Sequence, residues 1–493
     1  MAALPARTAL YRSASIRAIE AHALSALPPG TLMQRAGAAA AQWITRRWPL
    51  ARRVVVACGP GNNGGDGYVC ATELRRLGRA VDCIALAPAT TDDARAAERA
   101  WQQAGGVVLA PARADDALAA ADLIVDALFG IGLSRPLDGI AARWSTQMRS
   151  AAAPVIALDV PSGLDADTGA WVGGVVGVQA DATISFVAAK PGLFTADGPD
   201  AAGALVVDPL GVCPAQAPDG MLSGPDSFAA LRAPRLRNTH KGRFGDVQVV
   251  GGAAGMVGAA LIAARAALQL GAGRVYVRLL EGRVDVDPVT PELMFRAPPA
   301  DTAAVTVIGC GLGDGADARA ALDQALQTAR PCVLDADALN LIAAGPDGAA
   351  CLRASSALRV LTPHPLEAAR LLRITAQEVQ RDRIGACCAL ARASGAWVVL
   401  KGAGTVIASP GGAWWINPTG SPALATAGSG DALAGMLAAL LAQGFDGQSA
   451  VLGAVWLHGR AADLTDADVG LLASEIAPAA ARAWHALREE RVG

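Results

Sequence analysis

Residues 54–78 read VVVACGPGNNGGDGYVCATELRRLG, and this stretch decides the fold of the first half of the chain. The β-branched run at its start predicts a buried strand, the glycines that follow predict a tight loop, and the remaining residues predict a helix. Glycine carries no Cβ, so the backbone amides of such a loop can approach phosphate oxygens, and the helix presents its positive end to the same anion. The segment therefore predicts a site for a ligand that carries phosphate.

The spacing Gly59-x-Gly61-x-x-Gly64 also matches the dinucleotide fingerprint, although as a bare pattern it is weak. An NAD-dependent dehydrogenase further needs an acid at the end of the next strand, to hold a ribose. That strand, VDCIALA, has its acid, Asp82, near its start. The sequence therefore disfavours a dehydrogenase, while Asn62, Asn63 and Asp66 add polar groups that an ordinary turn does not need.

Short strand-like runs alternate with Ala- and Leu-rich helical patterns along the chain, which is typical of parallel α/β sheets. Strands are predicted at residues 53–58, 81–87, 123–127, 155–159, 183–187 and 204–207, and then at 246–250, 274–279, 305–308, 332–334, 359–361, 397–400, 405–408 and 414–416. The Pro-rich residues 209–234 between the two sets mark a domain boundary. We predict two domains, residues 1–215 and 225–493.

The composition suits a globular protein with large cores, because 53% of the 493 residues are hydrophobic and 17% are charged. A net charge of −2 gives no reason to expect nucleic acid or an anionic membrane as a partner. The mean hydropathy of +0.34 comes from alanine, and the longest apolar stretch, residues 432–445, is shorter than the ~20 residues of a spanning helix. We therefore expect no transmembrane segment.

The beginning of the chain lacks the apolar region of a secretory signal. Arg7, Arg12 and Arg17, with no acid before Glu20, leave a transit peptide as the alternative to an amphipathic first helix, which we favour. Nine scattered cysteines without a C-x-x-C pair indicate reduced thiols and a cytoplasmic protein.

The chain contains three lysines among its 42 basic residues, and all three lie in segments punctuated by Gly or Pro. Lysine and arginine are not interchangeable. We therefore interpret Lys190, Lys241 and Lys401 as positions where a compact ammonium group matters.

Two later strands of the first half end in an acid that a glycine-containing turn follows, in LIVDALFGIGLSRP (residues 123–136) and VIALDVPSGLDADTG (155–169). In a parallel sheet such strand ends share one edge, where ligands bind. We expect Asp126 and Asp159 to face the crevice of the Gly59–Gly67 loop. Each acid alone could also be a helix cap or a turn former.

GPGNNGGDG, DALFGIGLSRP and DVPSGLDADTG, in this order, closely resemble the NAD(P)H-hydrate epimerase family over residues 10–215. The resemblance implies a Rossmann-like three-layer domain, with Asp159 as the acid/base group beside the substrate. It implies a potassium ion at Asn63, Asp126 and Ser162, whose oxygens suit a hard cation. Ile131 departs from the threonine expected there. The residues implied to bind the hydrated cofactors, NADHX and NADPHX, are Asn62, Asn63, Gly64, Gly65, Asp66, Gly130, Ile131, Gly132, Leu133, Ser134, Arg135, Pro136 and Asp159.

The second half contains another strand, glycine loop and helix at residues 245–268, and a chemically stronger segment, ATAGSGDALAGMLAALLA, at 425–442. Gly428 and Gly430 free the backbone before a helix whose first amides can bind an anion. Asp431 there could be a simple N-cap. With Gly-Ser-Gly before it, we favour a phosphoryl-transfer site in which Asp431 accepts the proton of an attacking hydroxyl. No Walker motif is present. The Gly-x-Gly-Asp turn resembles that of the ribokinase-like fold.

THKGRFG, GGAAGMVGAA, VIGCGLG, VLDADALN, LTPHPLEAARLL and LKGAGT, in this order, resemble the ADP/ATP-dependent NAD(P)H-hydrate dehydratase family over about residues 225–485. The resemblance implies a ribokinase-like α/β domain that uses ADP or ATP with a magnesium ion, and Asp431 as its catalytic base. SPAL at residues 421–424 departs from the family pattern. Implied hydrate-pocket residues are Ala259, Gly311, His364 and Asp431, and implied nucleotide-binding residues are Lys401, Gly402, Ala403, Gly404, Thr405 and Gly430.

Together the resemblances predict repair of hydrated NADH and NADPH: the first domain epimerises the R and S hydrates, and the second dehydrates the S hydrate. ADP is expected, as in bacterial two-domain members, but the residues do not separate ADP from ATP or NADHX from NADPHX. The oligomeric state stays open. The alternatives are a ribokinase-class small-molecule kinase with a nucleotide-binding accessory domain, and a non-catalytic cofactor-binding scaffold.

Overall fold

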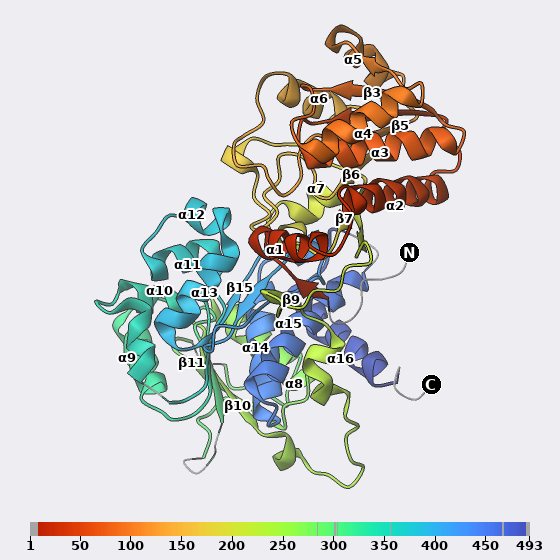
Figure 1. Ribbon diagram of the computed structural model, residues 1–493. Helices are drawn as coiled ribbons and strands as arrows, with labels where there is room; N and C mark the ends of the chain where they lie inside the picture. Colours follow the sequence, from red (N-terminus) through yellow and green to blue (C-terminus); the bar gives the residue numbers. More distant parts are fainter. Residues whose placement is uncertain are drawn as a thin grey trace. The chain divides into compact units, whose positions relative to one another are not determined.

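The chain divides into two compact units, Met1–Gly220 and Met221–Gly493 (Figure 1). The structure is a computed structural model that describes residues 8–489 except Arg283, Ala300, Asp301, Ala303, Ser355, Asp466 and Ala467. Arg7, one of the three early arginines, lies outside the described residues. The division between the units falls within the Pro-rich residues 209–234.

The first unit is built on a parallel sheet with the strand order β4-β3-β2-β5-β6-β7-β8. The chain runs outward from β2 through β3 to β4 and then returns to the other side of β2 at β5. Ligands bind at the carboxyl ends of the strands where the order reverses in this way. The strands are β2 (Arg53–Cys58), β3 (Ala80–Ala85), β4 (Val108–Leu109), β5 (Leu123–Ala127), β6 (Val155–Leu158), β7 (Ala182–Phe186) and β8 (Ala204–Asp208), and a short β1 (Ala9–Leu10) precedes them.

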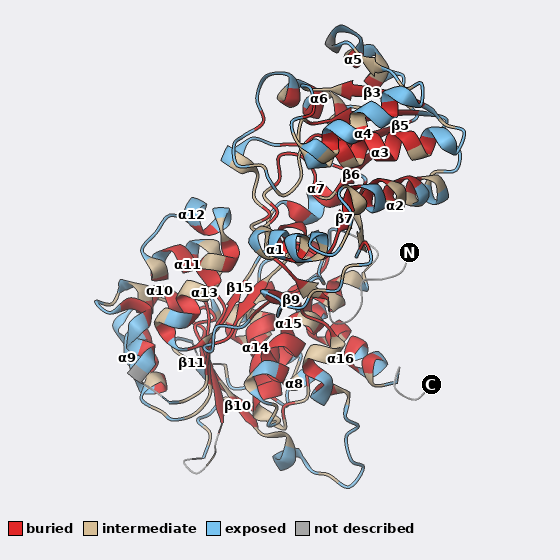
Figure 2. Ribbon diagram, in the orientation of Figure 1, coloured by how far each residue is buried: buried red, intermediate tan, exposed pale blue. Residues whose placement is uncertain are grey.

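Helices cover both faces of this sheet, which is why its strands are nearly continuous apolar runs (Figures 1 and 2). Successive side chains of a strand point to opposite faces. Val54 and Val56 accordingly pack with α2, α3 and α4, whereas Val55 and Ala57 pack with α5 and α6. The helices are α1 (Ser13–Leu24), α2 (Thr31–Arg47), α3 (Asn62–Arg76), α4 (Asp92–Gln103), α5 (Pro111–Ala119), α6 (Gly139–Arg149) and α7 (Gly198–Ala202).

The expected amphipathic first helix is α1. Its apolar side chains Ile16 and Ile19 are buried in the same core as α2 and α3, while its polar side chains Arg17 and His22 are exposed. Ser13 at its start donates hydrogen bonds from its backbone N–H (2.6 Å) and its hydroxyl (2.8 Å) to Asp167 Oδ1. The helix is therefore tied to the body of the first unit.

The second unit contains a sheet with the order β9-β17-β16-β15-β14-β13-β12-β10-β11, parallel except for the antiparallel pairs of β16 with β15 and β17. Every strand predicted in this half is present, and β9 is an addition. The strands are β9 (Gly220–Leu222), β10 (Asp246–Gly251), β11 (Arg274–Leu279), β12 (Val305–Ile308), β13 (Cys332–Leu334), β14 (Arg359–Leu361), β15 (Trp397–Leu400), β16 (Val406–Ala408) and β17 (Trp414–Ile416).

Helix α14 lies at the centre of the second unit's core, packed with α8, α15 and α16 against one face of the sheet. It carries most of the long apolar stretch of the sequence, which is thus a buried helix. Helices α9, α10, α11 and α13 lie on the other face (Figure 1). The helices are α8 (Val257–Gln269), α9 (Ala316–Leu326), α10 (Ala336–Ala344), α11 (Pro365–Leu372), α12 (Ala376–Arg381), α13 (Arg383–Ser394), α14 (Ser429–Ala442), α15 (Gly447–Asp463) and α16 (Ala473–Glu489).

The expected fold class is confirmed for both halves, since each is a largely parallel sheet between two layers of helices. Among the described residues, no helix combines the length and apolar character needed to cross a membrane.

Candidate active sites

A cavity of about 590 Å³ opens in the first unit beside the loops that follow β2, β5 and β6. It brings together much of the residue set expected to bind the hydrate, and it also receives side chains from α1. The expected residues that line it are Asn62, Asn63, Asp66, Gly130, Ile131, Gly132, Leu133 and Asp159. Ser134, Arg135 and Pro136 of the same turn are not among its lining residues.

Gly64 and Gly65 do not line the cavity either, and their role in the structure is close packing. A Cβ on Gly64 would overlap the carbonyl oxygen of Gly59, and a Cβ on Gly65 would overlap the methyl end of Met33 in α2. These two glycines therefore let the loop fold back on itself and let α2 approach α3.

Asp159 is held in an unusual backbone conformation at the wall of the cavity. Its φ of 67° is left-handed, which is rare outside glycine and costs on the order of 1–3 kcal/mol. Its Oδ1 accepts hydrogen bonds from the ammonium of Lys190 and from the backbone N–H of Phe186 (3.3 Å). Lys190, 1% exposed, also donates to Ser185 Oγ (2.9 Å) and to the carbonyl of Phe186 (2.6 Å). Asp159 and Lys190 therefore form an ion pair at the wall of the cavity.

Two further carboxyl groups, those of Glu20 and Asp66, face the same cavity and have raised pKa values. Burial raises the pKa of Glu20, and the nearby charge of Asp159 raises it further. The pKa of Asp66 is raised well above its usual value, first by burial and then by Asp159 and Glu20. The cavity thus combines a lysine-paired carboxylate with two carboxyl groups that keep their protons to higher pH than usual.

The residues expected to hold potassium are Asn63, Asp126 and Ser162. Asp126 and Ser162 are buried, and Asn63 lines the cavity. Asp126 Oδ1 accepts hydrogen bonds from the Ser162 hydroxyl (2.7 Å) and the Leu128 N–H (3.1 Å), and Oδ2 accepts one from the Ser162 N–H (2.8 Å). Burial is the main cause that raises the pKa of Asp126 to about 6. Both polar side-chain atoms of Asn63 are buried without a hydrogen-bond partner in the described part of the chain. A buried amide oxygen without a partner and a buried carboxylate are both ligands that suit a hard cation.

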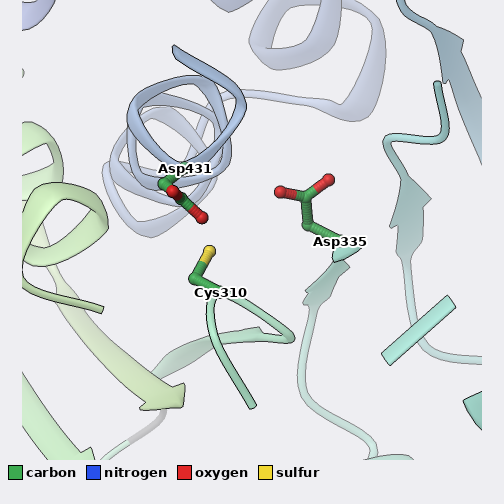
Figure 3. Close-up of side chains that lie close together, drawn as sticks. All are labelled: Cys310, Asp335 and Asp431. Carbon is green, nitrogen blue, oxygen red and sulfur yellow. The ribbon is translucent and has the colours of Figure 1, made fainter. Parts of the chain in front are cut away.

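The second candidate site lies where α14 begins, and Figure 3 shows its three central side chains. One carboxylate oxygen of Asp431, one of Asp335 and the sulfur of Cys310 all lie within 4.8 Å of one another. Burial and the charge of Asp335 raise the pKa of Asp431 to about 6, whereas a hydrogen bond with Cys310 and the charge of Lys401 act in the opposite direction. Asp431 is therefore a carboxyl group that can be a base near neutral pH.

Lys401 is the counter-ion of this acid pair. Its Nζ lies 2.9 Å from Asp335 Oδ1 and 3.9 Å from Glu367 Oε2. The same oxygen of Asp335 also accepts a hydrogen bond from the Thr362 hydroxyl at 2.7 Å. Burial alone would lower the pKa of Lys401, but the charges of Asp335 and Glu367 raise it overall. The ammonium therefore stays charged beneath the site.

Glycines bring the other expected residues of the second site together. Gly311 has a φ of 59°, and a Cβ there would lie 3.2 Å from that of Ala259. A Cβ on Gly430 would lie 3.3 Å from Lys401 Nζ and 3.7 Å from Asp335 Oδ2. Any larger residue at position 430 would therefore crowd the charged cluster.

His364 begins α11 as half of a capping box. Its Nδ1 accepts hydrogen bonds from the backbone N–H groups of Leu366 (3.1 Å) and Glu367 (3.3 Å), and its Nε2 lies 3.1 Å from Glu367 Oε1. An accepting Nδ1 requires the neutral ring, and burial together with Lys401 lowers the pKa of His364 in agreement. His364 therefore has a structural role as the cap of α11, which the sequence analysis did not predict.

Sequence reasoning did not select Glu20, Cys310, Asp335 or Glu367, and it noted Lys190 without naming its partner. The rarity of lysine was the usable signal: Lys190 and Lys401 form buried ion pairs beside the two candidate catalytic acids, whereas Lys241 is exposed. Asp335 lies inside the quoted motif VLDADALN, but nothing local distinguishes it from the other acid there.

Comparison with known proteins covers both units. Residues 247–482 match the family described as NAD(P)H-hydrate dehydratase, and residues 29–192 match the family described as YjeF-related protein N-terminus. The chain is 38% identical to a bifunctional NAD(P)H-hydrate repair enzyme of Coxiella burnetii, over 96% of this chain and 98% of that protein. It is also 38% identical to the protein of that name from Escherichia coli, over 89% and 86%.

A solved structure similar to the second unit is the ADP/ATP-dependent NAD(P)H-hydrate dehydratase of Bacillus subtilis, co-crystallised with ATP and Mg²⁺. It is 32% identical, covers 53% of this chain and 97% of its own, and has a TM-score of 0.47. The relatives that span nearly the whole chain decide the family. The chain belongs to the bifunctional NAD(P)H-hydrate repair enzymes.

Proposed function

We propose that this enzyme restores hydrated NADH and NADPH: the first unit interconverts the R and S hydrates, and the second removes water from the S hydrate at the expense of ADP or ATP. The observation that carries the proposal is Asp431, a carboxyl group with its pKa raised to about 6, in the first turn of α14. The first amides of a helix and a base that can accept a proton near neutral pH are the parts that phosphoryl transfer to a hydroxyl needs.

The dehydration follows from the poor leaving ability of hydroxide. Asp431 accepts the proton of the hydroxyl at carbon six, and that oxygen takes the transferred phosphoryl group. Phosphate then departs as the ring nitrogen supplies its electron pair. The iminium ion that results loses a proton from carbon five to solvent, and the new double bond between carbons five and six restores the dihydronicotinamide ring. Magnesium, suited by the hard oxygens of Asp335 and Asp431, would neutralise charge on the nucleotide phosphates.

The nucleotide and the hydrate bind to different residues of the second unit. The backbone around Gly430 and the turn of Gly402, Ala403, Gly404 and Thr405 hold the nucleotide, and Lys401 contributes chiefly its charge because its ammonium is paired with Asp335. Ala259, Gly311 and His364 line the hydrate pocket with Asp431. A neutral His364 can present a polar edge there without adding a charge.

In the first unit, Asp159 is the acid/base group that acts on the hydrate. The loop of Asn62 to Asp66 and the turn of Gly130 to Pro136 hold the rest of the coenzyme. A potassium ion would bind to Asn63, Asp126 and Ser162, where it would supply a fixed positive charge beside the phosphate-binding loop. The unpartnered side chain of Asn63 supports this placement.

The cysteines of the chain bear on where the protein works. Free cysteines throughout the described residues suit the reducing cytoplasm, which we propose as the location.

The proposal is tested by giving the purified protein mixed hydrates with ADP or ATP and following ring absorbance and phosphate release. We expect full recovery of NADH with one phosphate released per ring. A stable phosphorylated product would instead indicate a ribokinase-class kinase, and binding without turnover a scaffold.

A further inference from the structure

Glu20 is a cavity-lining residue of the first unit for which the chemistry described so far has no use. It lies on α1, whose Ile16 and Ile19 are buried. The packing of this helix therefore fixes the position of Glu20 at the cavity. The same helix is fixed to the rim of the cavity, because the Arg17 guanidinium donates a hydrogen bond to the carbonyl of Ile131 (3.3 Å). No hydrogen bond or ion pair to Glu20 is found within the described chain.

The charged groups around Glu20 come from four elements. Asp159 follows β6 and repels its negative charge, while Lys190, which precedes a short 3₁₀ helix, and Arg17 of α1 attract it. Asp66 of α3 faces the cavity as well and interacts with Glu20. Burial and Asp159 outweigh the two cations, so the pKa of Glu20 is raised.

Asp159 and Glu20 line the same cavity but have different partners. The ammonium of Lys190 donates a hydrogen bond to the carboxylate of Asp159, whereas Glu20 keeps its proton to higher pH than an ordinary glutamate. A hydrogen-bonded carboxylate and a protonated carboxyl group in one cavity are what a base and a proton donor require.

We propose that Glu20 is a second catalytic residue of the first unit, the proton donor that works with Asp159 in epimerisation of the hydrate. This inference rests on the proposed epimerase function. Epimerisation at a carbon that bears a hydroxyl and the ring nitrogen requires one of its two heteroatom bonds to break. Asp159, as the base, takes the hydroxyl proton, so the bond that breaks is the one to nitrogen.

The atoms and protons balance within the pair. Asp159 removes the hydroxyl proton, the oxygen forms a carbonyl with carbon six, the electron pair of the carbon–nitrogen bond goes to nitrogen, and Glu20 protonates that nitrogen. Rotation about the adjacent carbon–carbon bond presents the other face of the aldehyde. Nitrogen then attacks carbon six while Glu20 takes its proton back and Asp159 returns a proton to oxygen. Both carboxyl groups end as they began. If the hydroxyl group left as water instead, Glu20 would end each turnover without its proton and Asp159 with one, so the pair would have to be reset.

The test uses the full-length enzyme and its Glu20→Gln variant, which keeps the side-chain volume. Exchange between R and S hydrates is measured without nucleotide, and spontaneous exchange is subtracted. We expect kcat to fall about 100-fold or more, as for loss of a general acid, with KM changed by less than about threefold. Wild-type activity should fall at high pH as Glu20 loses its proton, and this alkaline decline should be absent from Glu20→Gln.

The matched control is Asp116→Asn, which removes an exposed carboxylate on α5 and should leave the rate and pH profile unchanged. Nucleotide-dependent dehydration of purified S hydrate reports that Glu20→Gln is folded in its second unit, and hydrate binding reports the same for the first. A Glu20→Gln rate near that of wild type, or a large loss only in Asp66→Asn, overturns the inference. Absence of exchange in the wild-type enzyme would instead refute the epimerase function on which the inference rests.

Discussion

Replacing Lys401 by methionine removes an ammonium group from beneath the second site while keeping most of its volume. Lys401 Nζ lies 2.9 Å from Asp335 Oδ1, and the carboxylate side chain is 3% exposed. At an effective dielectric constant of ~20, two unit charges at that distance attract each other by about 6 kcal/mol. Part of that attraction offsets the cost of burying both groups, so the loss expected on breaking such a pair is about 3–5 kcal/mol.

Differential scanning calorimetry measures this loss. A change of this size lowers the melting temperature of a domain as large as the second unit by on the order of 10 °C. The transition of the first unit is the internal reference. Arg460→Met is the control, because it removes an exposed arginine 3.8 Å from Asp463 and should cost no more than about 1 kcal/mol.

A double variant separates the charge from the packing. In Lys401→Met with Asp335→Leu no uncompensated charge remains at the pair, and the Thr362 hydroxyl can still donate to the carbonyl of Leu334 at 3.2 Å. We expect at least half of the lost stability to return, since a buried ion pair can often be replaced by apolar residues at little cost. A single variant that melts within about 2 °C of wild type would refute the view of Lys401 as the required counter-ion.

Three further variants and one pH profile test the roles of individual side chains. Asp431→Ala should abolish nucleotide-dependent recovery of NADH absorbance but leave exchange of the epimers intact; full dehydration in this variant would refute its role as the base. Asp159→Ala should leave the R half of a mixed hydrate to disappear only at the spontaneous rate, so two equally fast halves would count against it. The dehydration rate should fall as pH drops through about 6, where Asp431 takes up a proton. Cys310→Ala removes a hydrogen bond that lowers the pKa of Asp431, so the acid side of this profile should move to higher pH; an unchanged profile would show that the thiol has no such effect.

The strands were predictable because burial on both faces makes each a run of apolar, often β-branched residues that ends at a glycine or an acid. Leu123–Ala127 and Arg274–Leu279 have the predicted bounds. The prediction of 81–87 was wrong at its end, since β3 stops at Ala85 although Leu86 and Ala87 continue the apolar pattern. Strands β4 and β9, of two and three residues, are too short to produce a pattern.

The sites were predictable only where a side chain follows a strand or a glycine turn. Asp159 and Asp431 are of this kind. The pairing of charged groups was not predictable, because Lys190 is 31 positions from Asp159 and Lys401 is 66 positions from Asp335. Such pairs depend on which strands become neighbours, and no local pattern encodes that. In the sequence, Glu20 looks like any charged residue on the solvent side of a helix. Only the packing of α1 places it at the cavity.

The two sites share an arrangement that uses two of the three lysines of a chain otherwise rich in arginine. Each places one carboxylate against a lysine ammonium and has a second carboxyl group with a raised pKa nearby. In the first site these groups are Asp159, Lys190 and Glu20, and in the second they are Asp335, Lys401 and Asp431. An ammonium is compact and its three donors point apart, so Lys190 reaches a carboxylate, a hydroxyl and a carbonyl at once. A planar guanidinium is larger and presents its donors in one fork. Arginine would keep the charge at either position but could not occupy the same space, so the positive charge would no longer be held against Asp159 in the first site or against Asp335 in the second.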